Sequence, residues 1–204
     1  MRRSRRGRQS GFTLVEVMVS LGVMTVASLA IFGMQQQITR ANIHARQITT
    51  ATQIAQNWIE RLKLDAMRWT VVGDLSRTNY LRAVAAPGTR SGFIPIPLLV
   101  STSGVDTRVM SGAFDYFGSD LNTTAGAPPN LFFCASHRLN WVFDNQRAIR
   151  ADVRVWWARE GESAITTDYP LCQDDDTRLN PGPGGTNFDR YHIVYLSTVL
   201  RVGL

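Results

Sequence analysis

One apolar run near the N-terminus constrains this 204-residue chain more than any other feature. From Phe12 to Met34 the residues are apolar or small except for a few hydroxyl side chains, and Glu16 is the only charged residue. A helix over this run, rising about 1.5 Å per residue, is roughly 35 Å long and can cross a hydrocarbon core of about 30 Å. The sequence therefore predicts a transmembrane helix over residues 12–34.

Basic residues are concentrated before this run, and only Arg40 and Arg46 follow it closely. The positive-inside rule therefore places residues 1–11 in the cytoplasm and exports the rest of the chain. We expect a single-pass protein of the inner membrane whose C-terminal domain lies in the periplasm. The basic residues that precede the run are Arg2, Arg3, Arg5, Arg6 and Arg8.

The formal charge of +6 would favour a nucleic-acid partner if the charge lay on the exported part. Five of the 22 basic residues fall within residues 1–11, which leaves 17 basic against 16 acidic residues. The remainder of the chain is close to neutral, so binding to nucleic acid is not expected.

The position of the small residues indicates cleavage on the cytoplasmic side of the membrane. A secretory signal has its small-residue cleavage site after the apolar run, whereas here Ser10 and Gly11 precede it. A carboxylate such as Glu16 inside a membrane helix costs a few kcal/mol unless it has a partner, and is a functional hypothesis by default. Cleavage after Gly11 would create an ammonium group on Phe12, which could pair with Glu16 of a neighbouring subunit.

These residues together resemble the N-terminus of type IV prepilins. The resemblance depends on the small residue before the cut, on Phe12 to Leu14, on Glu16 and on the long apolar run. It implies cleavage between Gly11 and Phe12 by a prepilin peptidase that also N-methylates Phe12. It further implies that Glu16 acts in subunit assembly, and that the partners are other pilins in a filament.

Two interleaved series of residues at seven-residue spacing predict that the helix continues over residues 35–70. Successive members lie three or four residues apart and therefore line one face of a helix. No proline occurs between residues 12 and 86. We expect this face to pack against the chain's own sheet, with a coiled-coil dimer as the alternative. The series are Ile38, Ala45, Thr52, Ile59, Ala66 and Ala41, Ile48, Ala55, Leu62, Trp69.

Residues 71–204 predict an antiparallel β domain with long loops. Apolar residues alternate with polar ones over 149–157, a short polar turn separates this run from 139–143, and an aromatic and β-branched run follows at 191–202. The prolines between residues 70 and 130 allow only short strands there, over 93–100 and 108–117. A long N-terminal helix on this sheet is an α+β fold, the fold that resemblance to pilins also implies.

Two cysteines, Cys134 and Cys172, lie on the exported and oxidising side of the membrane. We expect them to form a disulfide, and a pair of buried free thiols is the alternative.

No catalytic site, cofactor or metal ion is predicted. The three histidines, His44, His137 and His192, are far apart in the sequence, and no nucleophile, phosphate-binding or zinc motif is present. Residues 174–176 are three aspartates without the spacing of a calcium loop, so a solvated acidic loop is expected. Most tryptophans are expected in the core, but Trp156 lies on the face opposite Trp157 and is expected to be exposed.

The segment over 51–69 and the last strand resemble minor pilins of the PilV group, which are similar to the small I-type pseudopilins of type II secretion. This resemblance implies a low-abundance subunit that joins other minor pilins in a priming or tip complex. The alternatives are a secretion pseudopilin and a competence pilin that binds DNA, for which Arg150, Arg154 and Arg159 would form a basic strip.

Overall fold

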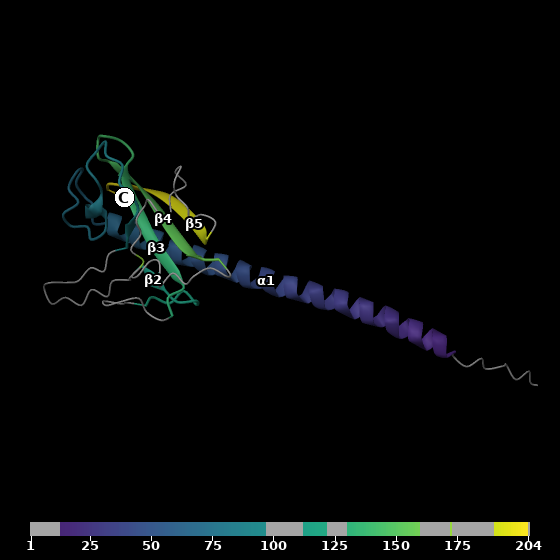
Figure 1. The fold of residues 1–204 in the computed structure, drawn as a ribbon. Helices are drawn as coiled ribbons and strands as arrows, with labels where there is room; N and C mark the ends of the chain where they lie inside the picture. Colours follow the sequence, from purple (N-terminus) through teal and green to yellow (C-terminus); the bar gives the residue numbers. More distant parts are fainter. Residues whose placement is uncertain (1–12, 97–111, 122–129, 160–171, 173–189, 204) are drawn as a thin grey trace, which may run out of the picture. The chain divides into compact units, whose positions relative to one another are not determined.

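The structure is a computed structural model that describes residues 13–96, 112–121, 130–159, 172 and 190–203. The chain forms two compact units, Met1–Arg46 and Gln47–Leu204. Helix α1 (Leu14–Ala66) belongs to both units, and the second unit adds the 3₁₀ turn η1 (Leu81–Ala83) and an antiparallel sheet (Figure 1). The fold class is therefore α+β, as predicted, with the arrangement found in pilins.

Thr13 immediately precedes helix α1, and its carbonyl accepts a hydrogen bond from the amide of Glu16 at 3.1 Å. The hydroxyl of Thr13 lies 3.4 Å from the same amide, as expected of a residue that caps a helix. No proline interrupts the 53 residues of the helix. It ends at Ala66, where a turn leads to the buried Trp69, so the helix stops four residues before the predicted boundary at residue 70.

The sheet has the strand order β1-β3-β4-β5, and β2 also pairs with β3. All pairs are antiparallel. The predicted hairpin is confirmed as β3 and β4, and the predicted last strand is β5, which lies at one end of the sheet (Figure 1). Strands β1 and β2 have two residues each, so the predicted early strands are shorter than expected within the described residues. Pro95 of β1 has no amide N–H for further pairing. The predicted residues 97–100 and 108–111 lie outside the described residues. The strands are β1 (Ile94–Pro95), β2 (Ala113–Phe114), β3 (Phe133–Trp141), β4 (Ala148–Ala158) and β5 (Tyr191–Arg201).

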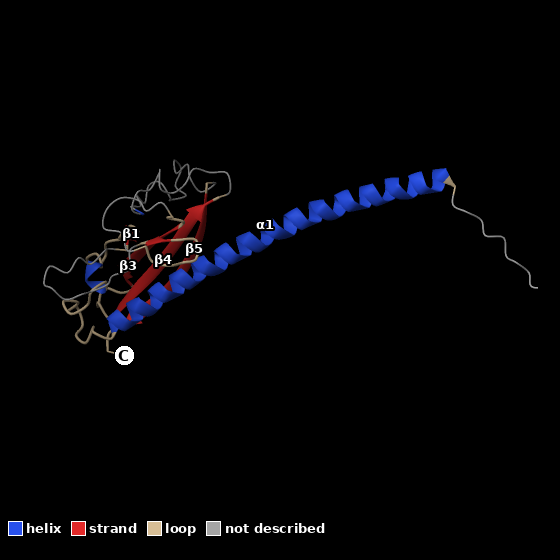
Figure 2. Ribbon diagram, turned by 90° about the horizontal axis from the view of Figure 1, so that it is seen from below, coloured by secondary structure: helices blue, strands red, loops and turns tan. Residues whose placement is uncertain are grey.

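Within the second unit, the part of α1 from Gln47 onward runs along one face of the sheet (Figure 2). The indole N–H of Trp157 donates to the side-chain oxygen of Gln47 at 3.2 Å, which identifies this inner face of the sheet. Packing against the chain's own sheet is therefore confirmed for this part of the helix. The buried face differs from the predicted series, because it also includes Ala51, Ile54 and Trp58. The early members of the series are exposed, contrary to the prediction; these are Ile38, Ala41, Ala45 and Ile48.

Asp65 fastens the end of α1 to the turn that follows it. This carboxylate is buried, and it accepts three backbone N–H groups, from Asn79 at 2.8 Å, Tyr80 at 2.7 Å and Leu81 at 3.1 Å. Hydrogen bonds from several amides to one carboxylate are strong, because the acceptor is charged. Asp65 therefore holds η1 against the helix.

The outer face of the sheet is also largely covered, which contradicts two predictions. Trp156 lies on the face opposite Trp157, as expected, but it is completely buried. Arg154 is 1% exposed, so the predicted basic strip with Arg150 and Arg159 does not exist. The ring of Phe93 covers the Arg154 guanidinium at 4.0 Å, because the chain leading into β1 folds over this face. The alternation of residues in β4 correctly predicted which side chains lie on each face of the sheet. It could not predict which other parts of the chain cover those faces.

Cys134 on β3 forms a disulfide with Cys172, and both residues are buried. The bond spans 38 positions of the sequence and attaches the chain before β5 to the middle of the sheet. The acidic residues 174–176 lie outside the described residues.

Candidate functional site

The first candidate site is the N-terminal turn of α1. Glu16 is exposed, and it lies in the first turn, where the free N–H groups of a helix favour a negative charge. Gly11 and Phe12, the residues predicted to flank the cleavage site, lie outside the described residues. The structure therefore describes Glu16 at the start of the helix but not the amine with which it is expected to pair.

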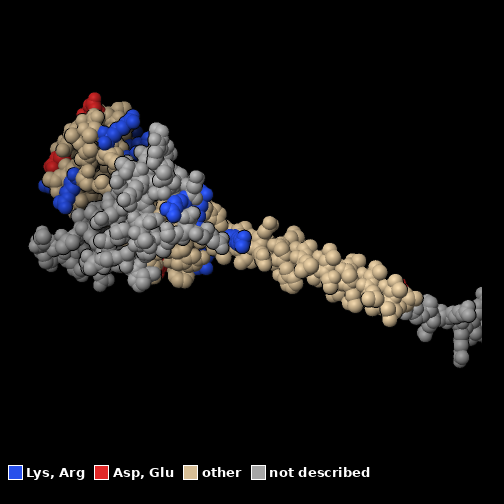
Figure 3. Space-filling model, viewed as in Figure 1, with Lys and Arg blue, Asp and Glu red and all other residues tan. Residues whose placement is uncertain are grey.

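The helix surface after Glu16 is apolar and exposed. An 18-residue window of α1 has a mean hydropathy of 2.1, and none of it is buried within the chain. Among the described residues this is the one helix that is long and apolar enough to cross a membrane. The visible face shows no Lys or Arg along this part of the helix (Figure 3). The exposed residues include Leu14, Val15, Val17, Met18, Val19, Leu21, Val23, Met24, Val26, Leu29, Ile31, Phe32 and Met34.

The hydroxyl groups in this segment are satisfied by the helix itself. Ser20 donates to the carbonyl of Glu16 at 2.7 Å, and Ser28 donates to the carbonyl of Met24 at 2.8 Å. Thr25 donates to the carbonyl of Gly22 at 2.7 Å. None of these hydroxyls needs water, so they are compatible with a lipid environment, and Glu16 remains the one charged side chain.

The chain has an apolar N-terminal helix with a single carboxylate, and the amphipathic part of this helix packs on an antiparallel sheet. This is a pilin-like arrangement. Residues 6–32 match the family model of the prokaryotic N-terminal methylation motif. This match includes Gly11, Phe12 and Glu16, and it supports a protein of the type IV pilin class with a prepilin signal. Comparison with curated proteins and with solved structures gave no match.

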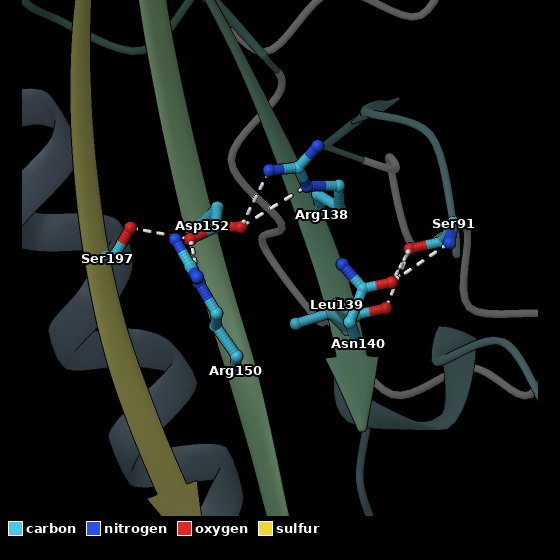
Figure 4. Close-up of polar contacts among 7 residues, drawn as sticks. All are labelled: Ser91, Arg138, Leu139, Asn140, Arg150, Asp152 and Ser197. Atoms are coloured by element: carbon cyan, nitrogen blue, oxygen red, sulfur yellow. Dashed lines mark hydrogen bonds and ion pairs between the residues drawn. The ribbon is translucent and has the colours of Figure 1, made fainter. Parts of the chain in front are cut away.

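The second candidate site is a polar cluster on the outer face of the sheet, around Asp152 (Figure 4). Arg138 on β3 approaches one carboxylate oxygen at 3.0 Å, and Arg150 approaches the other at 2.8 Å. The hydroxyl of Ser197 on β5 donates to Asp152 at 2.5 Å. Burial acts to raise the pKa of Asp152, but the hydrogen bonds from Ser197, Arg150 and Arg138 outweigh it and hold the pKa below its ordinary value. Asp152 is therefore an ionised carboxylate that joins three strands.

Local sequence patterns do not predict this cluster around Asp152. The predicted strands carry charged residues of both signs at their polar positions, which is compatible with ion pairs between strands. This pattern does not identify the partners, because Arg138 and Asp152 meet only in the register that pairs β3 with β4.

A hollow beside the cluster has a volume of about 380 Å³. Its walls include Arg90, Arg138, Arg150, Asp144 and Asp152. Arg138 and Arg150 already contact Asp152, and among the described residues that line the hollow no nucleophile lies beside a base. In the described part of the chain, no group of three His, Cys, Asp or Glu side chains is placed to hold a metal ion. The geometry of this region supports a structural role.

His137 lies on the inner face of β3 and is 2% exposed. Neither of its ring nitrogens has a hydrogen-bond partner among the described residues. Burial lowers the pKa of His137 to about 4, so the ring is neutral at physiological pH. His192 lies on β5 beside Trp157, with ring centroids 5.2 Å apart. His137 pairs with Val153 across β3 and β4, and Val153 pairs in turn with Leu196, whereas His192 pairs with Trp157. His137 and His192 therefore do not form a pair.

Proposed function

We propose that this chain is a minor subunit of a type IV pilus that joins other minor pilins in a priming or tip complex. The observation that carries the proposal is Glu16, a single carboxylate at the start of an exposed apolar helix, within a match to the methylation motif. The resemblance of residues 51–69 and of the last strand to minor pilins of the PilV group supports the minor role.

In the proposed mechanism, the chain is first stored in the inner membrane with residues 1–11 in the cytoplasm and the C-terminal domain in the periplasm. A prepilin peptidase cleaves between Gly11 and Phe12 and methylates the new amine. Glu16 then pairs with the Phe12 amine of an adjacent subunit, because each charge is costly in the membrane without the other. The subunit acts by assembly and is not an enzyme.

A minor pseudopilin of type II secretion is the second candidate, since the motif and the fold fit both machines equally well. A competence pilin that binds DNA is disfavoured, because Arg154 is buried and Arg150 pairs with Asp152. Crosslinking of the full chain in its native envelope distinguishes the two machines. Links to minor pilins support the pilus, and links to secretion pseudopilins support the secretion system.

Glu16→Gln tests the assembly role, because it keeps the shape of the side chain and removes the charge. We expect the number of pili per cell to fall by about tenfold or more, since one charge-assisted contact is worth roughly 1.5 kcal/mol or more. Ser20→Ala is the matched control, because it changes the same helix one turn later without altering charge, and should leave pilus number unchanged. Wild-type piliation in the Glu16→Gln strain would refute the mechanism.

A further inference from the structure

Strand β5 forms one end of the sheet. It pairs with β4 on one side and, among the described residues, with no strand on the other. It has 11 residues and is the longest free edge in the described sheet, since β1 and β2 both lie beside β3. The two views of the ribbon show β5 at this outer position (Figures 1 and 2).

The hydrogen-bond pattern shows which backbone groups of β5 face outward. The amide of Arg159 donates to the carbonyl of Arg190 at 2.9 Å, and the amide of Val202 donates to the carbonyl of Arg147 at 3.2 Å. These two bonds flank the β4–β5 ladder, and in an antiparallel pair bonded residues alternate with unbonded ones. The even-numbered residues of β5 therefore point their backbone groups at β4. The odd-numbered residues, Ile193, Tyr195, Ser197 and Val199, point theirs away from the sheet.

This edge is accessible and lacks the usual protection. The side chains of Tyr195 and Val199 are 49% and 51% exposed. Proteins commonly protect a long edge with charges, proline or a bulge, because free strand groups pair with other chains. From Ile193 to Val199 there is no formal charge and no proline, and the ladder to β4 is regular.

The charge beside the edge is positive at its C-terminal end. Arg201 is exposed and forms no ion pair with any described residue. Arg150 of β4 pairs with Val199 of β5, and its side chain is 57% exposed. The single negative charge of Asp152 neutralises only one of the two positive guanidinium groups that contact it. A carboxylate of a partner near Val199 and Arg201 would therefore be attracted to the remaining positive charge.

We propose that the edge of β5 binds an extended segment of a second, different protein, which adds a strand to the sheet. The outward N–H and C=O groups recur every second residue, and only another strand can pair with such a row. The segment is uncharged along Ile193 to Val199 and carries a carboxylate near Arg201. This edge would be the surface through which the proposed pilin-like subunit contacts a partner. The proposal rests on the proposed function only where a second copy of this chain is excluded as the partner.

A second copy of β5 fits the edge poorly in either direction. The start of β5 lies near Gln47, through Trp157, and its end lies near Trp69, where the amide of Gly203 donates at 3.3 Å. Strand and helix thus run the same way within the second unit, so an antiparallel copy would place the two Gln47 residues at opposite ends of the joined sheet. The proposed function anchors both chains in one membrane through the residues before Gln47, which disfavours this arrangement. A parallel copy in register would place two Arg201 side chains together, and like charges on neighbouring strands are destabilising.

Site-specific photocrosslinking of the full chain in its native cells tests the proposal. Tyr195 or Val199 is replaced by p-benzoylphenylalanine, and the crosslinked peptides are identified by mass spectrometry. We expect both positions to reach one segment of one partner, with attachment points about four residues apart, because paired strands advance together. Replacement of Arg82, an exposed residue of η1, serves as the control and should not reach that segment.

Val199→Pro and Val199→Ala form a matched pair for the same assay, with the crosslinker at Tyr195. Proline removes an N–H that faces away from β4, so the β4–β5 ladder stays intact, whereas alanine keeps the N–H. We expect proline to lower the crosslink yield about tenfold and alanine to leave it within about twofold, since a lost hydrogen bond to a strand is costly. Equal yields in the two variants would overturn the proposal.

The crosslink map of the unmodified edge decides the question even if the proline variant fails to fold. Links that scatter over unrelated segments, or that join β5 to β5 of a second copy, would overturn the proposal. Links in register to a protein that is not a pilin would support strand addition and would refute the minor-pilin role. The Glu16→Gln experiment tests that role separately, so the two failures are distinguishable.

Discussion

At the scale of single residues, three carboxylates have three different roles. Glu16 is proposed to act in assembly, and Asp65 accepts hydrogen bonds from three backbone amides. Asp152 links three strands through two arginines and a serine. Local patterns identified Glu16, because its neighbours in sequence are all uncharged. They could not identify Asp65 or Asp152, because every partner of Asp65 lies at least 14 residues away, and Asp152 has partners on two other strands besides Arg150 on its own.

Asp65→Ala should lower the free energy of unfolding by about 3 kcal/mol, since three buried amides lose a charged acceptor. Urea unfolding of the full chain in detergent, followed by tryptophan fluorescence, measures this change. Glu60→Ala on the same helix is the control, because Glu60 is exposed and, in the described part of the chain, pairs only with Lys63, at 2.7 Å. Its effect should stay within about 0.5 kcal/mol. Similar losses in the two variants would contradict the role of Asp65.

Because His137 is buried, we expect the free energy of unfolding to fall as the pH is lowered from 6.5 to about 4. Its pKa is lowered from 6.5 in the unfolded chain to about 4 in the folded chain. Below pH 6.5 the unfolded state binds a proton that the folded state rejects, so the free energy of unfolding falls until about pH 4 and then levels off. The full difference corresponds to about 3 kcal/mol.

His137→Leu should remove this pH dependence, and urea unfolding at several pH values measures the difference between the two proteins. The pKa of Asp152 lies below 3.8, so the stability that this carboxylate contributes is lost only under more acidic conditions. Parallel curves for wild type and His137→Leu from pH 7 to pH 4 would show that the histidine is not responsible.

At the scale of elements, α1 combines two surfaces in one continuous helix. The residues up to Met34 are exposed and apolar, whereas residues from Ala51 onward are buried against the sheet of the second unit. Sequence periodicity distinguished the two parts, because a membrane helix is apolar on all sides and a helix on a sheet is apolar on one. Strand β4 was identified from its alternation, but its outer face is buried as well, which no property of β4 itself reveals.

Gly11→Val tests the processing of the segment before α1. We expect the protein to remain at its uncut mass, because a bulky side chain before the cleavage site obstructs the peptidase. Intact-mass analysis of membrane fractions measures this, with Ser10→Ala as a control that should still be cleaved. A mature terminus at Phe12 in the Gly11→Val protein would argue against the assigned cleavage site.

At the scale of the whole molecule, the disulfide is the one covalent link between distant parts of the chain. Replacing both Cys134 and Cys172 by serine should lower the free energy of unfolding by up to about 4 kcal/mol in the chain-entropy model for a loop of this length. Urea unfolding of the full chain, with and without a reductant, provides the measurement. Reduction should weaken the wild type and leave the double variant unchanged. A loss well under 1 kcal/mol in the double variant would mean that the bond constrains little.

The sequence by itself determined the apolar helix, the position of Glu16, the amphipathic continuation and the alternation of β4, because each depends on residues close together in the chain. Only the tertiary structure decided that Trp156 and Arg154 are buried, that Asp152 meets Arg138 and Ser197, and that β5 is the end strand of the described sheet. These features depend on strand order, register and covering loops. They arise from contacts between distant residues, whose energies no local pattern contains.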